Sequence, residues 1–91
     1  MKRLKAKILG KVQGVFFRDT AQKTAQDLEL TGWVCNEPDG SVQIVAEGDE
    51  KKLERFLEFL KEGSDSAVVS DVDIKWEKPK GEFEEFEVKY D

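Results

Sequence analysis

The chain opens with charged and apolar residues in alternation and changes to helical spacing within its first twenty positions. Residues 3–8 alternate strictly, which is typical of a strand with one buried face. From residue 17 the pattern repeats every three or four positions, which predicts a helix from about residue 17 to residue 29. The positions that mark this helix are Phe17, Ala21, Thr24, Ala25 and Leu28.

The middle of the chain predicts a hairpin. Two short apolar runs, 32–36 and 41–46, have the length and composition of strands. Between them, Pro38, Asp39 and Gly40 are residues that favour a tight turn. The two strands are therefore expected to pair with each other.

A second helix and two more strands complete the pattern. Asp49 is a suitable N-cap, and Gly63 is expected to end the helix. The buried stripe of this helix would be Leu53, Phe56, Leu57 and Leu60. A fourth strand is predicted where Val72, Ile74 and Trp76 alternate with charged residues, and a short closing strand contains Phe86, Val88 and Tyr90.

The order strand–helix–strand–strand–helix–strand predicts an α+β fold. Two split βαβ units of this kind form a ferredoxin-like sandwich, here with a short C-terminal strand added. We expect an antiparallel sheet with both helices on one face. At 91 residues the chain has the length of a single domain, residues 1–91. This fold hosts many activities, so it does not identify the function.

Composition narrows the classes of partner. The net charge of −5 argues against nucleic acid, because a phosphate backbone requires a basic surface. No apolar run is long enough to span a membrane. Cys35 is the only cysteine and has no internal disulfide partner, so a cytoplasmic location is expected. Basic residues gather in 1–11 and glutamates in 82–87, which suggests that oppositely charged strands share a face of the sheet.

The chain contains no histidine, and this excludes several chemistries. Histidine is the commonest general base and metal ligand, and it activates most serine and cysteine nucleophiles. Cys35 has no cysteine or histidine partner, so a zinc site is not expected. The carboxylates show no spacing that singles out an acid–base pair. A catalyst made from this chain would therefore work by positioning and electrostatics.

The segment from Gly10 to Arg18 carries candidate chemistry, because it joins the first strand to the first helix. Gly10 and Gly14 allow a sharp turn, and such a turn can aim several backbone N–H groups at one anion. Arg18 adds a planar charged fork that suits phosphate oxygens. The spacing matches neither the Walker A pattern nor the dinucleotide fingerprint. On spacing alone, an anion site and a plain turn both stay open.

Asn36 strengthens the interpretation as a site. It lies at the end of the second predicted strand, just before the turn. Asparagine is common at strand ends, so a purely structural role is one explanation. Its amide can also accept a hydrogen bond from a water and donate one to an oxyanion. Beside a phosphate site, that group could hold an attacking water.

Four segments together resemble the acylphosphatase family. The most specific are Gly10–Arg18 and Gly32–Asn36, the latter followed by Asp39 and Gly40. Ala46–Gly48 and Gly81–Phe83 support the resemblance, which covers nearly the whole chain in the correct order. It implies hydrolysis of the carboxyl–phosphate bond of acyl phosphates to a carboxylate and inorganic phosphate. It also implies that no metal and no covalent intermediate are used.

The resemblance assigns roles by position in the motifs. It implies that the phosphate is bound by the backbone of Gln13, Gly14, Val15, Phe16, Phe17 and Arg18. The Arg18 side chain would contact the phosphate oxygens, and Asn36 would orient the attacking water. With no protein base, the substrate itself would accept the proton. One departure is Cys35, which stands where the family often has a basic residue.

Two alternative functions are compatible with the predicted fold. A non-catalytic module that senses phosphate or another anion could share this fold, but Arg18 and Asn36 together favour catalysis. An RNA-binding domain would need aromatic residues on its open sheet face, and the central strands carry none at Leu4, Ala6, Ile8, Val42 or Ile44. We expect a monomer.

Overall fold

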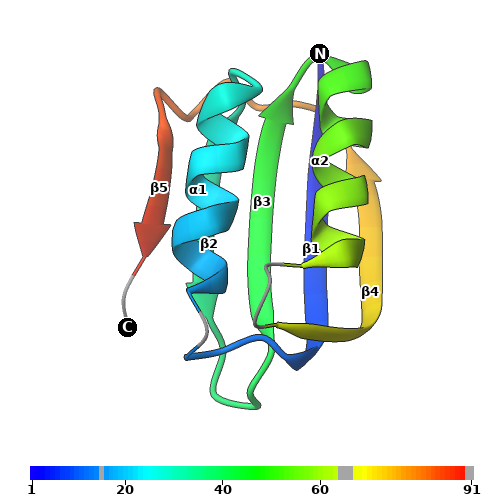
Figure 1. Cartoon of the computed structure of the whole chain (residues 1–91). Coiled ribbons are helices and arrows are strands. Elements are labelled where there is room, and N and C mark those ends of the chain that lie inside the picture. Colours follow the sequence, from blue (N-terminus) through cyan, green and yellow to red (C-terminus); the bar gives the residue numbers. More distant parts are fainter. Residues whose placement is uncertain (15, 64–66, 90–91) are drawn as a thin grey trace.

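Five strands form one sheet, and two helices cover one of its faces (Figure 1). This computed structural model describes residues 1–14, 16–63 and 67–89. In chain order the elements are β1 (Lys2–Lys11), α1 (Phe17–Asp27), β2 (Thr31–Asn36), β3 (Val42–Gly48), α2 (Glu50–Glu62), β4 (Val68–Glu77) and β5 (Phe86–Lys89). The α+β ferredoxin-like arrangement is confirmed. Tyr90, expected in the closing strand, lies outside the described residues.

The strand order in the sheet is β4-β1-β3-β2-β5. β1 pairs antiparallel with β3 and β4, and β2 pairs antiparallel with β3, so the predicted hairpin is confirmed. The expectation of an entirely antiparallel sheet is wrong at one edge, because β5 runs parallel to β2. After β4 the chain crosses the end of the sheet at which β2 begins, so β5 enters from that same end (Figure 1).

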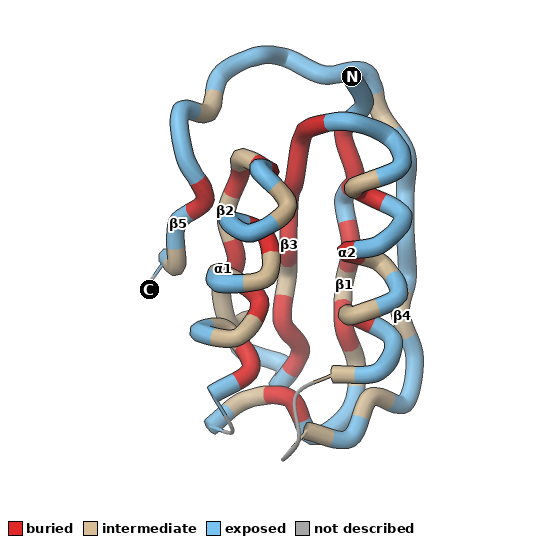
Figure 2. The backbone as a smooth tube through the Cα atoms, turned by 45° about the horizontal axis from the view of Figure 1, so that its top comes forward, coloured by how far each residue is buried: buried red, intermediate tan, exposed pale blue. Residues whose placement is uncertain are grey.

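Alternation along β1 places every second side chain in the core. Leu4, Ala6 and Ile8 are almost fully buried. Their partners in β3 are Ala46, Ile44 and Val42. The helices cover these residues with their own buried side chains, which are Phe17, Ala21 and Ala25 from α1 and Leu53, Phe56 and Leu60 from α2. Figure 2 shows the buried positions gathered between the helices and the sheet.

The two helices differ in how well their ends follow the prediction. α2 begins after Asp49, whose carboxylate accepts hydrogen bonds from the N–H groups of Lys51 and Lys52, as a cap should. α1 ends two residues earlier than predicted, because Glu29 adopts a left-handed φ of 59°. The N–H of Leu30 then bonds the carbonyl of Ala25 at 2.9 Å, which closes the helix in a Schellman motif.

A buried salt-bridge network fixes the end of the sheet at which β1 begins. Glu47 of β3 is 2% exposed, and its carboxylate lies 2.9 Å from the Arg3 guanidinium. Backbone N–H groups of Lys80 and Gly81 donate to the same carboxylate at 2.9 and 3.1 Å. Arg3 also lies 3.0 Å from Glu82, which precedes β5, so the basic start of the chain contacts the acidic segment through a connecting loop and not through strand pairing.

Glu47→Gln should destabilise the fold at neutral pH. Burial alone would raise the pKa of the Glu47 carboxyl, but the N–H groups of Lys80 and Gly81 and the Arg3 guanidinium lower it overall. Removing this charge leaves Arg3 with a weaker partner in the interior. We expect a loss of about 3 kcal/mol in the free energy of unfolding at pH 7, measured by urea denaturation.

The same variant should show a characteristic pH dependence. Because the folded pKa is lowered, the stabilising effect of the carboxylate is present above its ordinary pKa and disappears as the pH falls. The difference between wild type and Glu47→Gln should therefore shrink between pH 7 and pH 3. The matched control is Glu58→Gln on the exposed face of α2, which should change stability little. A pH-independent difference would contradict the assignment.

Candidate active site

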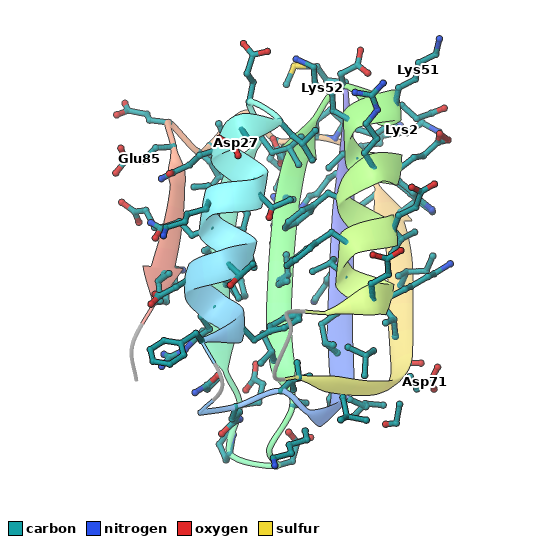
Figure 3. All side chains as sticks on the ribbon, in the orientation of Figure 1. Lys2, Asp27, Lys51, Lys52, Asp71 and Glu85 are labelled. Carbon is teal, nitrogen blue, oxygen red and sulfur yellow. The ribbon has the colours of Figure 1, made fainter. Side chains whose placement is uncertain are left out.

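The end of β1, the start of α1 and the β2–β3 turn lie at the same end of the sheet (Figure 1). Residues 12–16 connect β1 to α1, and residues 37–41 form the turn after β2. Figure 3 places Lys2, Lys51 and Lys52 at the opposite end of the molecule. The fold thus brings the two predicted functional segments close to each other.

Left-handed backbone shapes the turn before α1. Gly14 has a φ of 72°, and a Cβ added there would meet no atom within 4 Å, so only the backbone angle favours glycine. Phe16 adopts φ 60° and ψ 19°, which costs a non-glycine residue about 1–2 kcal/mol. Its ring is 78% exposed. The turn itself therefore holds this conformation, since the ring gains little from burial. Val15 lies outside the described residues.

The N-terminus of α1 has no side-chain cap. At α2 the Asp49 carboxylate occupies two of the first N–H groups, whereas no side chain does so at Phe16, the N-cap position of α1. The first N–H groups of a helix have no partner within the helix, and they carry the positive end of its dipole. The start of α1 is therefore suited to bind an anion.

A hollow of about 240 Å³ opens at this helix start, large enough for a phosphate group. It is lined by Val12, Gly14, Phe16, Phe17, Arg18 and Asp19. Arg18 is half-buried and contributes a permanent positive charge beside the backbone turn. This hollow thus contains both kinds of group that the sequence suggested for phosphate binding.

Asn36 ends β2 and pairs with Val42 at the start of β3. It does not line the hollow. Its Oδ1 atom is buried and accepts no hydrogen bond from the described residues. A buried acceptor of this kind is normally satisfied, by water where no protein group is available. The geometry is therefore that of a group able to hold a water.

The Gln13 side chain links the two functional segments directly. Its Nε2 donates hydrogen bonds to the carbonyl of Glu37 at 2.7 Å and to the carbonyl of Ser41 at 2.8 Å. Glu37 directly follows Asn36 in the chain. Sequence reasoning assigned Gln13 only a backbone role. It missed this contact because the partners lie 24 and 28 residues away.

The β2–β3 turn is further held by Lys7 and Asp39, whose side chains lie 2.8 Å apart. The same Asp39 carboxylate accepts a hydrogen bond from the backbone N–H of Ser41 at 2.9 Å and one from its hydroxyl group. Lys7 first, and then the two Ser41 groups, hold the pKa of Asp39 well below its usual range. Asp39 followed two residues later by serine is a recognisable turn signal, whereas the contact with Lys7 was not predictable.

Other parts of the structure are less suited to an anion. A larger hollow of about 400 Å³ lies between β2 and the chain before β5, but four glutamates line it: Glu82, Glu84, Glu85 and Glu87. Within residues 1–14, 16–63 and 67–89, no cluster of three acidic or cysteine side chains could hold a metal ion. No helix in that part of the chain is long and apolar enough to cross a membrane.

The five aliphatic residues on the central strands do not lie on the open face of the sheet, as the comparison with RNA-binding domains assumed. All five are buried under the helices, where Ala6 pairs with Ile44, Ile8 pairs with Val42, and Leu4 pairs with Ala46. The open face of the sheet instead presents the alternate residues. On β1 and β3 these include Lys5, Lys7 and Gln43, none of them aromatic.

The family profile, the related sequences and the solved structures reported below all belong to one family. The acylphosphatase family profile matches residues 4–88. An acylphosphatase of Syntrophotalea carbinolica is 48% identical over 88 residues, covering 97% of this chain and 96% of that protein. One of Thermotoga maritima is 46% identical and covers 99% of both. The crystal structure of a Bacillus subtilis acylphosphatase superimposes with a TM-score of 0.95 at 37% identity, covering 99% of this chain and all of that one.

Relieving the left-handed conformation of Phe16 should stabilise the fold. In Phe16→Gly the steric cost of about 1–2 kcal/mol disappears, and the greater freedom of glycine in the unfolded chain offsets about 0.4–1 kcal/mol of that gain. We expect the free energy of unfolding to rise by up to about 1.5 kcal/mol in urea denaturation. The reverse change, Gly14→Ala, should lower it by a similar amount. A loss of stability in Phe16→Gly would contradict this explanation.

Proposed function

Since the chain belongs to the acylphosphatase family, a family of hydrolases that act on acid anhydrides, we propose where its reaction takes place. Acyl phosphates bind with their phosphate at the turn 13–18 and at Arg18. Asn36 holds the water that attacks the phosphorus atom. The observation that carries this proposal is the start of α1, where no side chain caps the first N–H groups. The Gln13 side chain connects the turn before this helix to the turn that follows Asn36.

Phosphate binding is assigned to backbone and guanidinium together. Gln13, Gly14, Val15, Phe16, Phe17 and Arg18 contribute their N–H groups, and the Arg18 side chain contacts the phosphate oxygens. The left-handed backbone at Gly14 and at Phe16 supports this role, because left-handed residues in a turn can direct backbone N–H groups toward one point. The dipole of α1 adds to the attraction at short range.

Water positioning is assigned to Asn36. Its Oδ1 would accept a hydrogen bond from the water, which leaves a lone pair of the water oxygen directed at phosphorus. The buried, unsatisfied state of this atom supports the assignment. Holding a nucleophile in line with the bond that breaks is a large part of catalysis in phosphoryl transfer.

The reaction then proceeds in one displacement. The water oxygen forms a bond to phosphorus while the bond between phosphorus and the acyl oxygen breaks. The carboxylate leaves, and a proton of the water passes to a phosphate oxygen, so inorganic phosphate is the second product. The preorganised N–H groups and Arg18 stabilise the charge on the equatorial oxygens. These steps use only groups of this chain and of the substrate.

Arg18→Ala should abolish most of the activity by removing the contact with the phosphate oxygens. The test is hydrolysis of acetyl phosphate by the purified chain. We expect kcat/KM to fall by about 10²–10³-fold, together with weaker competitive inhibition by inorganic phosphate. Arg55→Ala, on the exposed side of α2, is the matched control and should retain full activity. Unchanged phosphate inhibition in Arg18→Ala would contradict the assigned contact.

Asn36→Ala should separate binding from turnover. The phosphate-binding turn remains, so the inhibition constant of inorganic phosphate should stay within about twofold of wild type. Turnover should fall by about 10²-fold or more, because the water is no longer held in line. Steady-state kinetics with acetyl phosphate measure both quantities. A variant that binds phosphate more weakly but turns over normally would overturn the water-positioning role.

A further inference from the structure

We propose that the Gln13 side chain is a positioning residue, which fixes the water-holding Asn36 relative to the phosphate-binding turn. This inference rests on the function proposed above. It adds to that function a side-chain role that is separate from the backbone contact already assigned to Gln13.

Both N–H groups of the Gln13 side-chain amide donate hydrogen bonds to the β2–β3 turn. A glutamine NH₂ group has two hydrogens, and here one is directed to the Glu37 carbonyl and the other to the Ser41 carbonyl, at 2.7 and 2.8 Å. The two acceptors lie on opposite sides of the β2–β3 turn. A single side chain therefore contacts both strands of the hairpin where they enter the turn.

The hairpin does not need Gln13 in order to form. The Glu37 carbonyl already accepts a bond from the N–H of Gly40 at 3.1 Å, and the Ser41 carbonyl accepts one from the N–H of Glu37 at 2.9 Å. Asp39 holds the same turn through Lys7 and Ser41. The Gln13 amide bonds to carbonyls that already have one partner, so its contribution is to the placement of the turn.

The sheet sets β1 and β2 on either side of Val42, which pairs with both Ile8 and Asn36, but its pairing ends at Lys11 and does not place the chain that follows. β3 lies between β1 and β2, so the segment after β1 and the segment after β2 belong to strands that are not neighbours. The last register pair between β1 and β3 is Ile8 with Val42, five residues before Gln13. Beyond that pair, the chain that leads into the phosphate-binding turn is attached to the hairpin through the Gln13 amide.

The rate of the proposed reaction depends on where Asn36 lies relative to the phosphate-binding turn. Gly14 of the phosphate-binding turn follows Gln13, and the water-holding Asn36 precedes Glu37. The hydrogen bond between Gln13 and Glu37 therefore joins residues that are next to the two halves of the site. An in-line attack tolerates little displacement of the nucleophile, and an error of about 1 Å can cost about 10²-fold in rate. Loss of the Gln13 amide should therefore affect the chemical step more than the binding of phosphate.

The experiment compares three variants with wild type. Gln13→Ala removes the amide and leaves the backbone N–H in place. Gln13→Glu keeps the shape but replaces the donor by a carboxylate, which repels the two carbonyls until it is protonated and can donate one hydrogen bond. Gln22→Ala is the matched control, because the Gln22 amide also donates to a carbonyl, that of Phe86 at 3.2 Å, between α1 and β5.

For each protein the readouts are kcat, the inhibition constant of inorganic phosphate, and the urea midpoint. Gln13→Ala should lower kcat by about 10–100-fold, with phosphate inhibition within about twofold of wild type and a urea midpoint close to that of Gln22→Ala. Gln22→Ala should keep wild-type kcat. The activity of Gln13→Glu relative to wild type should rise as the pH falls from 7 to 5.

Other outcomes distinguish this inference from the function on which it rests. Wild type without hydrolysis would overturn the proposed function. With wild type active, a normal kcat in Gln13→Ala, a parallel loss of kcat and phosphate affinity, or a pH-independent ratio in Gln13→Glu would each overturn the positioning role. An independent check is the NMR signal of the Asn36 side-chain amide during phosphate titration, which should shift in wild type and shift less in Gln13→Ala.

Discussion

The candidate site depends on the packing of the buried Phe17 ring against α2. Phe17 is the first residue of α1, is only 1% exposed, and stacks against Phe59 of α2 with ring centroids 6.0 Å apart. Its burial fixes the start of α1 close to the end of β1. The short chain between them must then reverse sharply, which accounts for left-handed backbone on either side of residue 15. Phe16 and Arg18 are the neighbours of Phe17 in the chain. They are consequently held at the end of the sheet where β1 ends and α1 begins.

The proposed anion site is compatible with an acidic protein because the relevant interactions are local. The chain carries a net charge of −5, and a cleft near β5 is lined by glutamates. At the start of α1, oriented N–H groups and one guanidinium act at contact distance, where they outweigh distant charges screened by salt. The Asp39 carboxylate on the adjoining turn has partners of its own in Lys7 and Ser41.

Patterns within one segment were predictable from the sequence, and contacts between distant segments were not. Alternation predicted the strands, Asp49 predicted the start of α2, and the two glycines predicted the sharp turn between β1 and α1. The left-handed Glu29 was missed because nothing in its residue type signals that conformation. The parallel pairing of β5, the Arg3–Glu47 pair and the Gln13 amide bonds depend on the path of the chain through space, which a local pattern does not encode.

The most direct test of the account is a titration of the protein with inorganic phosphate, followed by ¹H–¹⁵N NMR. The account predicts that amide signals shift at residues 13–18 and at 36–41, with one shared dissociation constant equal to the inhibition constant measured in acyl phosphate hydrolysis. Shifts confined to the open face of the sheet, or a dissociation constant different from the inhibition constant, would contradict the claim that the turn before α1 and the Asn36 hairpin form one catalytic site.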